Sequence, residues 1–488
     1  MIFDFLIYCL GKKEDMSMVI AGMNWQQLYS FASKQAILGL CFEGIERLGK
    51  EYPEELKQNP IGRELLMTWM GKAQQIRRQN MKVNAVASKL FSMLREDGLR
   101  CCVLKGQGNA LMYPNPYFRT PGDIDVWIDV SRERIMEYAR KRFELGDDIR
   151  LQHLETSLDG VPVELHFFPC SMNNPIYHAR LQKWFRRNAD LQCSHIVGLP
   201  DGAGDIAIPT TSFNVIYQLT HLYHHFFDEG IGMRQIIDYY YVVNNYLSNP
   251  SVSLSKGSST SHPSPSSMVF TPPSVPPFPG DRNLRGEGGN RPTRCCICPT
   301  CPSPAGGSLT HSQALALSKR ARDVTAPSRC SEPLRSKDGG ASKPSPNCAG
   351  WDRLSIEGDN SSGSATAVTS SASTALDVVQ RELKYLGLWK YAGAVMYVLH
   401  EALGLSEEKM IVPVDEKRGR LLLAEILDGG NFGRHFTKYA GFTHQSMGKK
   451  YFLKIWRNMH FVRYYPAEAL CEPLFRTWHF FWRMKNKK

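Results

Sequence analysis

The chain has 488 residues, 42% of them hydrophobic, and a formal net charge of +12. That length and that apolar share are enough for two or three domains with packed cores, which excludes a chain that is disordered throughout. No stretch is long and apolar enough for a transmembrane helix, so no membrane span is expected.

The positive charge is dispersed along the sequence. Denser basic patches are short and include Arg77-Arg78, Arg140 to Arg142, Arg186-Arg187 and Lys485 to Lys488. We therefore favour a solvated basic surface over a nucleic-acid interface, and nucleic acid stays open as a partner. The same positive field favours acidic small molecules.

The cysteines and the first residues bear on the cellular compartment. Thirteen cysteines are scattered along the chain, and the apolar start from Met1 to Leu10 contains Asp4 and lacks the basic segment of a secretory leader. We expect this start to be an amphipathic helix. A disulfide framework is not expected, and a reducing, cytoplasmic location fits best. The oligomeric state is not predicted.

Residues 1–98 are predicted to be helical. Apolar side chains recur at helical spacing at Trp25, Leu28, Ala32, Ala36 and Leu40, and the run from Ile61 to Leu94 has the same period.

Residues 99–205 are predicted to form a strand-rich core. Arg100 to Leu104, Ile124 to Ile128 and Val161 to Phe168 have the composition or alternation of strands. Ser131 is expected to cap a helix between the last two strands. The apolar stripe of that helix is Ile135, Met136, Ala139 and Phe143.

Three carboxylates in this core have the pattern of a metal site. Asp123 and Asp125 lie two residues apart at the start of a strand, after the turn Pro121-Gly122, so both point to one face. Glu164 lies on the later strand, and if that strand is a neighbour, all three meet at one sheet edge. Such a set suits a hard divalent cation.

The loop after the first core strand has the pattern of an anion site. In Lys105-Gly106-Gln107-Gly108 the two glycines let backbone amides approach an anion closely, and Lys105 supplies a positive charge. The sequence therefore predicts a phosphate cradle beside the metal site.

Several nearby residues have both a functional and a structural interpretation. Arg119 could bind a phosphate bidentately or be an ordinary loop arginine. His166, on the face of Glu164, could approach the nucleotide or support the metal, or only hydrogen-bond a neighbouring strand. Asp129 is interpreted as structural or solvated.

Residues 206–249 are predicted to begin a helical domain. His221, His224 and His225 share a helix face and would permit a zinc site, but buried or surface histidines are favoured because no glutamate follows in the HExxH manner. Arg234 and Asp238 are spaced for an ion pair within the helix, or they reach back from the helical domain to a bound nucleotide.

Between residues 250 and 374 the composition changes to Ser, Pro, Gly, Thr and Ala, which predicts a disordered insert. It is a linker, a metal-bound knuckle or foreign sequence, and we favour a nonfunctional or foreign insert. Cys295, Cys298 and Cys301, with Cys330 or His311, give only a weak zinc pattern. Residues 375–488 are predicted to complete the helical domain and to end in a basic, aromatic tail.

The order of glycine-containing loop, Asp-x-Asp strand and later strand carboxylate resembles the polymerase beta-type nucleotidyltransferase superfamily. The segments LKG, YP, RxxGDID and VELH resemble its uncharacterised bacterial branch. The resemblance extends from the N-terminal helices through His221 to Tyr240 and resumes near Leu376. The superfamily usually has a glycine pair shortly before the acidic pair, whereas Gly106 and Gly108 lie farther upstream.

The resemblance implies an α+β fold, with a minimal nucleotidyltransferase core, a mixed sheet backed by helices, between N-terminal and C-terminal helical segments. It implies an enzyme that transfers a nucleoside monophosphate from a nucleoside triphosphate, most simply ATP, to a hydroxyl or phosphate and releases pyrophosphate. Mg²⁺, with Mn²⁺ as the alternative, would be held by Asp123, Asp125 and Glu164. The triphosphate would be held by Lys105, Gly106 and Gly108, with Arg119 or Arg234 adding countercharge.

Two other functions stay open. One is a noncatalytic nucleotide-binding or interaction module of the same fold, since the insert divides the helical domain. The other is a toxin-like transferase that modifies RNA, for which basic charge would be needed beside the site. The sequence identifies neither the acceptor nor the preferred base.

Overall fold

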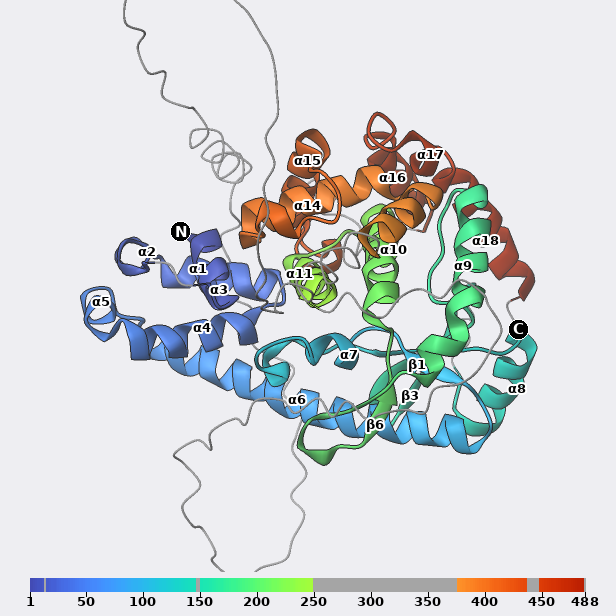
Figure 1. Cartoon of the computed structure of the whole chain (residues 1–488), viewed down its shortest axis with the longest axis horizontal. Helices are drawn as coiled ribbons and strands as arrows, with labels where there is room; N and C mark the ends of the chain where they lie inside the picture. Colours follow the sequence, from blue (N-terminus) through green and yellow to red (C-terminus); the bar gives the residue numbers. More distant parts are fainter. Residues whose placement is uncertain (13–14, 146–149, 249–374, 437–446, 487–488) are drawn as a thin grey trace, which may run out of the picture.

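The computed structural model describes residues 1–12, 15–145, 150–248, 375–436 and 447–486 (Figure 1). The insert predicted at 250–374, with its cysteine cluster, lies outside these residues. The described part is mostly helical and contains a small mixed sheet of four strands. The predicted α+β class is therefore confirmed.

The chain before the first strand is helical, as predicted. Its helices are α1 (Ile2–Cys9), α2 (Ser17–Ala21), α3 (Trp25–Lys34), α4 (Leu38–Glu51), α5 (Pro53–Gln58) and α6 (Arg63–Glu96). Met1 to Leu10 is a helix with one buried face, as expected. The stripe from Trp25 to Leu40 is not one helix, because Ala36 has φ +57° and separates α3 from α4.

The four-stranded sheet consists of β1 (Cys101–Val103), β2 (Ile124–Ile128), β3 (His153–Leu158) and β4 (Val161–His166). Its order is β1-β2-β4-β3, with β2 and β4 parallel and the two outer pairs antiparallel. Asp159 and Gly160 both have positive φ, which makes the tight turn of the β3–β4 hairpin. The three predicted strands correspond to β1, β2 and β4.

Side chains alternate between the two faces of the sheet, and each face packs against a different hydrophobic core. Val103, Val126 and Leu165 face a cluster that contains α6 and the helix α8 (Arg132–Arg142). Cys102 and Trp127 face the other cluster, where the Trp127 ring lies 6.3 Å from that of Phe213. Because neighbouring side chains on a strand point to opposite faces, a one-residue shift would exchange the two sets.

The helix predicted after Ser131 is confirmed as α8. The Ser131 side chain accepts a hydrogen bond from the backbone N–H of Arg134, and Ile135 and Ala139 are fully buried.

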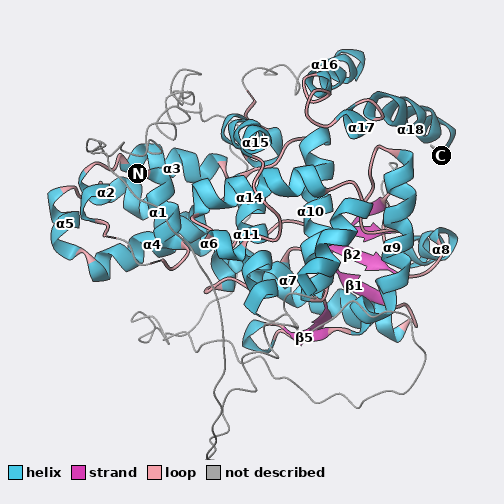
Figure 2. Ribbon diagram, turned by 45° about the horizontal axis from the view of Figure 1, so that its top comes forward, coloured by secondary structure: helices cyan, strands magenta, loops and turns pink. Residues whose placement is uncertain are grey.

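The sequence analysis did not expect a long helix within the strand-rich region. Helix α9 (Pro175–Ser194) lies there, and Figure 2 shows it beside the strands. Asn174 caps it and Pro175 occupies its first turn, which is a recognisable start signal. The remaining core elements are α7 (Gln107–Ala110), β5 (Ile196–Gly198) and β6 (Asp205–Ala207).

The second helical region contains α10 (Thr211–Asp228), α11 (Met233–Ser248), a helical stretch at 375–385, α14 (Trp389–Leu403), α15 (Glu416–Gly429), α16 (Met447–Met459), α17 (Pro466–Ala469) and α18 (Glu472–Asn486). Tyr246 of α11, Val379 and Leu383 belong to one buried cluster, so the chain on both sides of residues 249–374 shares a core. Within the described ranges, no helix combines the length and apolar character that crossing a bilayer requires.

Candidate active site

Asp125 and Glu164 lie directly opposite each other on the parallel strands β2 and β4. Asp123 precedes β2, and one oxygen from each of the three carboxylates can be chosen so that all lie within 4.8 Å of one another. Asp123 is exposed, whereas Asp125 is only 3% exposed. The structure therefore brings the three predicted carboxylates together, with Asp123 nearest to solvent.

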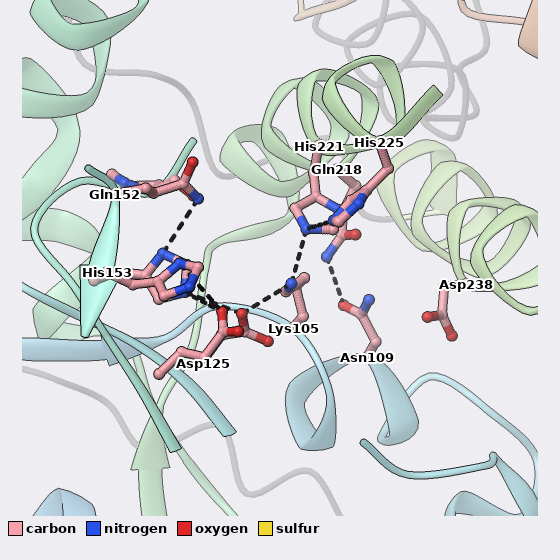
Figure 3. Close-up of polar contacts among 12 residues, drawn as sticks. Lys105, Asn109, Asp125, Gln152, His153, Gln218, His221, His225 and Asp238 are labelled. Atoms are coloured by element: carbon pink, nitrogen blue, oxygen red, sulfur yellow. Dashed lines mark hydrogen bonds and ion pairs between the residues drawn. The ribbon is translucent and has the colours of Figure 1, made fainter. Parts of the chain in front are cut away.

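Lys105 lies against this cluster. Its Nζ is 2.9 Å from Oδ1 of Asp125 and 2.7 Å from Nε2 of His221 (Figure 3). Burial lowers the pKa of the Lys105 ammonium, but the neighbouring carboxylates, with Asp125 foremost, outweigh this and raise it. Lys105 is thus a charged group that links the strand carboxylates to α10.

His166 bridges two of the carboxylates. Its Nε2 is 3.0 Å from Asp125 Oδ1 and 3.1 Å from Glu164 Oε2. Burial disfavours the charged imidazole, but the hydrogen bonds to these carboxylates outweigh it and raise the pKa of His166 to about 9. Burial raises the pKa of Glu164, yet His166 outweighs it and the net pKa is lowered. The contact with Asp125 on the neighbouring strand fits both a support of the metal site and a plain hydrogen bond between strands, so the role of His166 stays a prediction.

The donor set fits a hard divalent cation. Carboxylate oxygens are the ligands that Mg²⁺ prefers, and here they gather on adjacent strands without cysteine. Asp123, Asp125 and Glu164 are the residues that would hold the ion.

The glycines of the loop have different surroundings. Gly106 has φ +52°, lines the pocket beside the carboxylates, and a Cβ there would be 3.6 Å from the Asp123 carbonyl oxygen. Gly108 is buried, and a Cβ there would come within 2.9 Å of Ile208. The space at Gly108 is thus taken by packing, and its predicted contact with a triphosphate stays a prediction.

Polar side chains attach this loop to α10. The Asn109 side-chain oxygen accepts hydrogen bonds from the amide groups of Asn214 and Gln218, at 3.3 and 3.2 Å. Figure 3 shows Gln218 between Asn109 and the histidines of α10.

Arg119 forms a buried ion pair with a carboxylate. Its Nε and Nη2 donate to the two oxygens of Asp238 at 2.8 and 2.7 Å, and the Tyr113 hydroxyl donates to the same carboxylate at 2.7 Å. Burial raises the pKa of Asp238, but Arg119 outweighs it and the pKa is lowered. Asp238 thus pairs with Arg119 of the loop before β2. Contact of Asp238 with a nucleotide and binding of phosphate by Arg119 both stay predictions.

Arg234 has more unused hydrogen-bonding capacity than Arg119. Its Nη1 donates to the Thr120 carbonyl at 3.2 Å, and its buried Nε lacks a hydrogen-bond partner among the described residues. Burial, together with Arg119, lowers the pKa of its guanidinium. A buried arginine that lines the pocket in this way is suited to an anionic ligand.

The three histidines of α10 do not converge on one point. His221 contacts Lys105 and His225, whose Nε2 is 3.0 Å away, whereas His224 Nδ1 is 3.5 Å from the hydroxyl of Ser171. His221 is buried and the other two are half-buried, which fits the favoured interpretation of buried or surface histidines. Asp129, interpreted as structural, pairs with Arg100.

A comparison with known proteins finds one matching family. The family described as "uncharacterised nucleotidyltransferase" matches residues 21–252. Residues 21–252 are therefore similar to that family. No curated protein and no solved structure matches the chain.

The match to this nucleotidyltransferase family covers the chain from α3 to α11, including the four-stranded sheet. It therefore includes the carboxylates, Lys105 and Arg234. The resumption expected near Leu376 lies beyond the matched residues.

Two neighbours of the three carboxylates were missed in the sequence. His153 lies opposite His166 on β3, with the ring centroids 5.0 Å apart, and counting back from the Asp159-Gly160 turn would have found it. Burial, with His166, lowers the pKa of His153 to about 2. Phe432 also lines the pocket, and no local signal marks it.

Proposed function

We infer that the protein is an active nucleotidyltransferase that moves a nucleoside monophosphate from a nucleoside triphosphate to a hydroxyl or phosphate acceptor, with release of pyrophosphate. ATP is the simplest donor. The observation that carries this proposal is the in-register pair Asp125 and Glu164, joined by Asp123. Asp123 and Asp125 line a pocket whose wall also contains Lys105 and Arg234.

The side chains of the site would have different roles in this reaction. Asp123, Asp125 and Glu164 would hold one or two divalent ions, which when bound activate the acceptor oxygen and neutralise charge on the transferred and leaving phosphates. Lys105 and Arg234, which both line the pocket, would attract and orient the triphosphate. His166 holds Asp125 and Glu164 in place through its two hydrogen bonds. Most of the rate acceleration would come from positioning and electrostatics.

Arg234 is the better candidate for direct contact with phosphate than Arg119. The Arg119 guanidinium is held by both oxygens of Asp238, so binding an anion would compete with an existing buried ion pair. The free Nε of Arg234 has no such competitor among the described residues.

The direct test is pyrophosphate release from each of the four nucleoside triphosphates with Mg²⁺, with a cell extract supplying acceptors. Asp123→Asn should abolish release, and Asp129→Asn is the matched control because Asp129 pairs with Arg100 at the other end of the strand. Release that persists in Asp123→Asn would contradict the proposal. A folded wild-type protein that binds nucleotide but releases nothing with any acceptor would favour the noncatalytic alternative.

A further inference from the structure

The pocket beside the carboxylates is lined mostly by polar and charged side chains. Among the described residues that line it, only Leu222 and Phe432 have apolar side chains. A nucleoside triphosphate has an anionic part and a flat aromatic part. The cationic side chains suit the first part, and the surface at Phe432 is the place that suits the second.

The backbone at Phe432 is held in an unfavourable conformation. Its φ of +54° lies in the left-handed region, which bulky side chains rarely adopt. Strained residues of this kind gather at ligand-binding sites, where the surrounding structure maintains them. The segment is the short 3₁₀ helix Asn431–Gly433.

Close packing against the turn between α10 and α11 maintains this conformation. A Cβ on Gly433 would lie 1.9 Å from the carbonyl oxygen of Glu229, and a Cβ on Gly232 would lie 2.7 Å from Cα of Asn431. The two backbones thus meet where no side chain fits. The position of the Phe432 ring is consequently fixed by the same turn that begins α11.

The ring lies beside groups that belong to the proposed nucleotide site. The Arg234 guanidinium lies over the ring, 5.4 Å from its centroid, and the His225 ring is 5.3 Å away in an edge-on arrangement. A base placed on Phe432 would therefore be next to the arginine expected to contact phosphate.

A second, independent observation is a buried amide on the pocket wall. Gln235 is 7% exposed, and its Oε1 accepts the backbone N–H of Gly232 at 2.9 Å. This bond fixes the orientation of the amide, so the other end is Nε2, a donor, and it has no hydrogen-bond partner among the described residues. A buried donor without a partner is costly, and a ligand acceptor atom would satisfy it.

We propose that Phe432 is the platform on which the nucleobase stacks, and that Gln235 Nε2 donates to an acceptor atom on the edge of that base. The proposal rests on the proposed function and adds to it the place of the base. It also assigns part of the site to the chain beyond the residues that match the family.

The test compares Phe432→Leu, which removes the aromatic face, with Phe432→Trp, which keeps one. Equilibrium dialysis of the full chain, without acceptor, measures binding of each nucleoside triphosphate and of inorganic tripolyphosphate. Stacking on an aromatic side chain is sequence-tolerant, and its loss should weaken binding of every nucleoside triphosphate by about 10-fold or more. Phe432→Trp should retain nucleotide binding, and all three proteins should bind tripolyphosphate equally.

A further variant covers the case in which Phe432→Leu does not fold. Phe432→Gly accepts the left-handed backbone without strain and should also lose nucleotide affinity while keeping that for tripolyphosphate. Unchanged nucleotide binding in Phe432→Leu or Phe432→Gly, or an equal loss for nucleotide and tripolyphosphate, would overturn the proposal. If the wild-type protein binds tripolyphosphate but no nucleotide, the proposed function itself fails.

Discussion

Arg119 holds both oxygens of Asp238, and this pair connects the loop before β2 to α11. The two residues are buried, at 4% and 5% exposed. Because Asp123 follows Arg119 by four residues, the pair also sets where the carboxylate cluster lies relative to the pocket wall that carries Arg234. The site is thus built across two segments that are far apart in the sequence.

Removal of one partner of this pair should destabilise the protein strongly. Arg119→Ala leaves the Asp238 carboxylate buried without its partner, which typically costs about 3–5 kcal/mol. Urea unfolding would measure the change in the free energy of unfolding. The control is Arg187→Ala, which breaks the exposed pair with Glu382 and should cost less than about 1 kcal/mol. Similar losses in both variants would contradict the structural role of the Arg119–Asp238 pair.

Arg234 should affect binding more than stability. Arg234→Lys keeps a positive charge but loses the planar fork, and Arg234→Gln loses both, so affinity for a nucleoside triphosphate should fall in that order. We expect a loss of about 10-fold or more for Arg234→Gln, corresponding to a charge-assisted hydrogen bond. Equilibrium dialysis would measure it, with urea unfolding as the check on the fold. Unchanged affinity in Arg234→Gln would remove Arg234 from the proposed site.

Because Asp123 is exposed, its substitution should affect activity without affecting stability. Asp123→Asn should lose turnover by more than about 100-fold while the free energy of unfolding changes by less than about 0.5 kcal/mol. Isothermal titration with Mg²⁺ should also show weaker binding of the ion. Asp125→Asn differs, because Asp125 is buried against Lys105 and His166, and it should lower stability as well. Metal binding that is identical in wild type and Asp123→Asn would contradict the predicted ligand set.

Local patterns account for the part of the site that could be predicted. The strand positions of Asp125 and Glu164 follow from alternation over a few residues, and the tight β3–β4 turn fixes which residues of that hairpin pair. The sequence did not predict that β2 pairs with β4, because strand order depends on contacts across the whole core. The composition gave no sign of α9, although its Asn174-Pro175 start is a local signal.

Long-range contacts account for what could not be predicted. Arg119 and Asp238 are 119 residues apart, and no local rule distinguishes that pair from an Arg234–Asp238 pair within one helix. Phe432 has no turn-forming character, so its left-handed backbone is imposed by packing against the α10–α11 turn. Residues of this kind become visible only when the chain is folded.

A last prediction concerns the dependence of stability on pH. Glu468 of α17 is 2% exposed and accepts the backbone N–H groups of Asn173 and Asn174. Burial raises its pKa from 4.5 to about 7, and the nearby Glu472 contributes in the same direction. Since the folded-state pKa lies above the unfolded-state value, the contribution to stability is fully present below about pH 4.5 and is lost as the pH rises through about 7.

Glu468→Gln should therefore remove a fall in the free energy of unfolding, on the order of 3 kcal/mol, between these two pH values. Urea midpoints measured from pH 4.5 to 8 would show it, with Glu408→Gln at an exposed position as the control. Burial also raises the pKa of Glu43 to about 7, so part of the slope should remain in Glu468→Gln and disappear only when Glu43→Gln is added. A pH profile that Glu468→Gln leaves parallel to the wild type would show that this carboxyl stays ionised in the folded protein, with its charge balanced by the two backbone N–H groups.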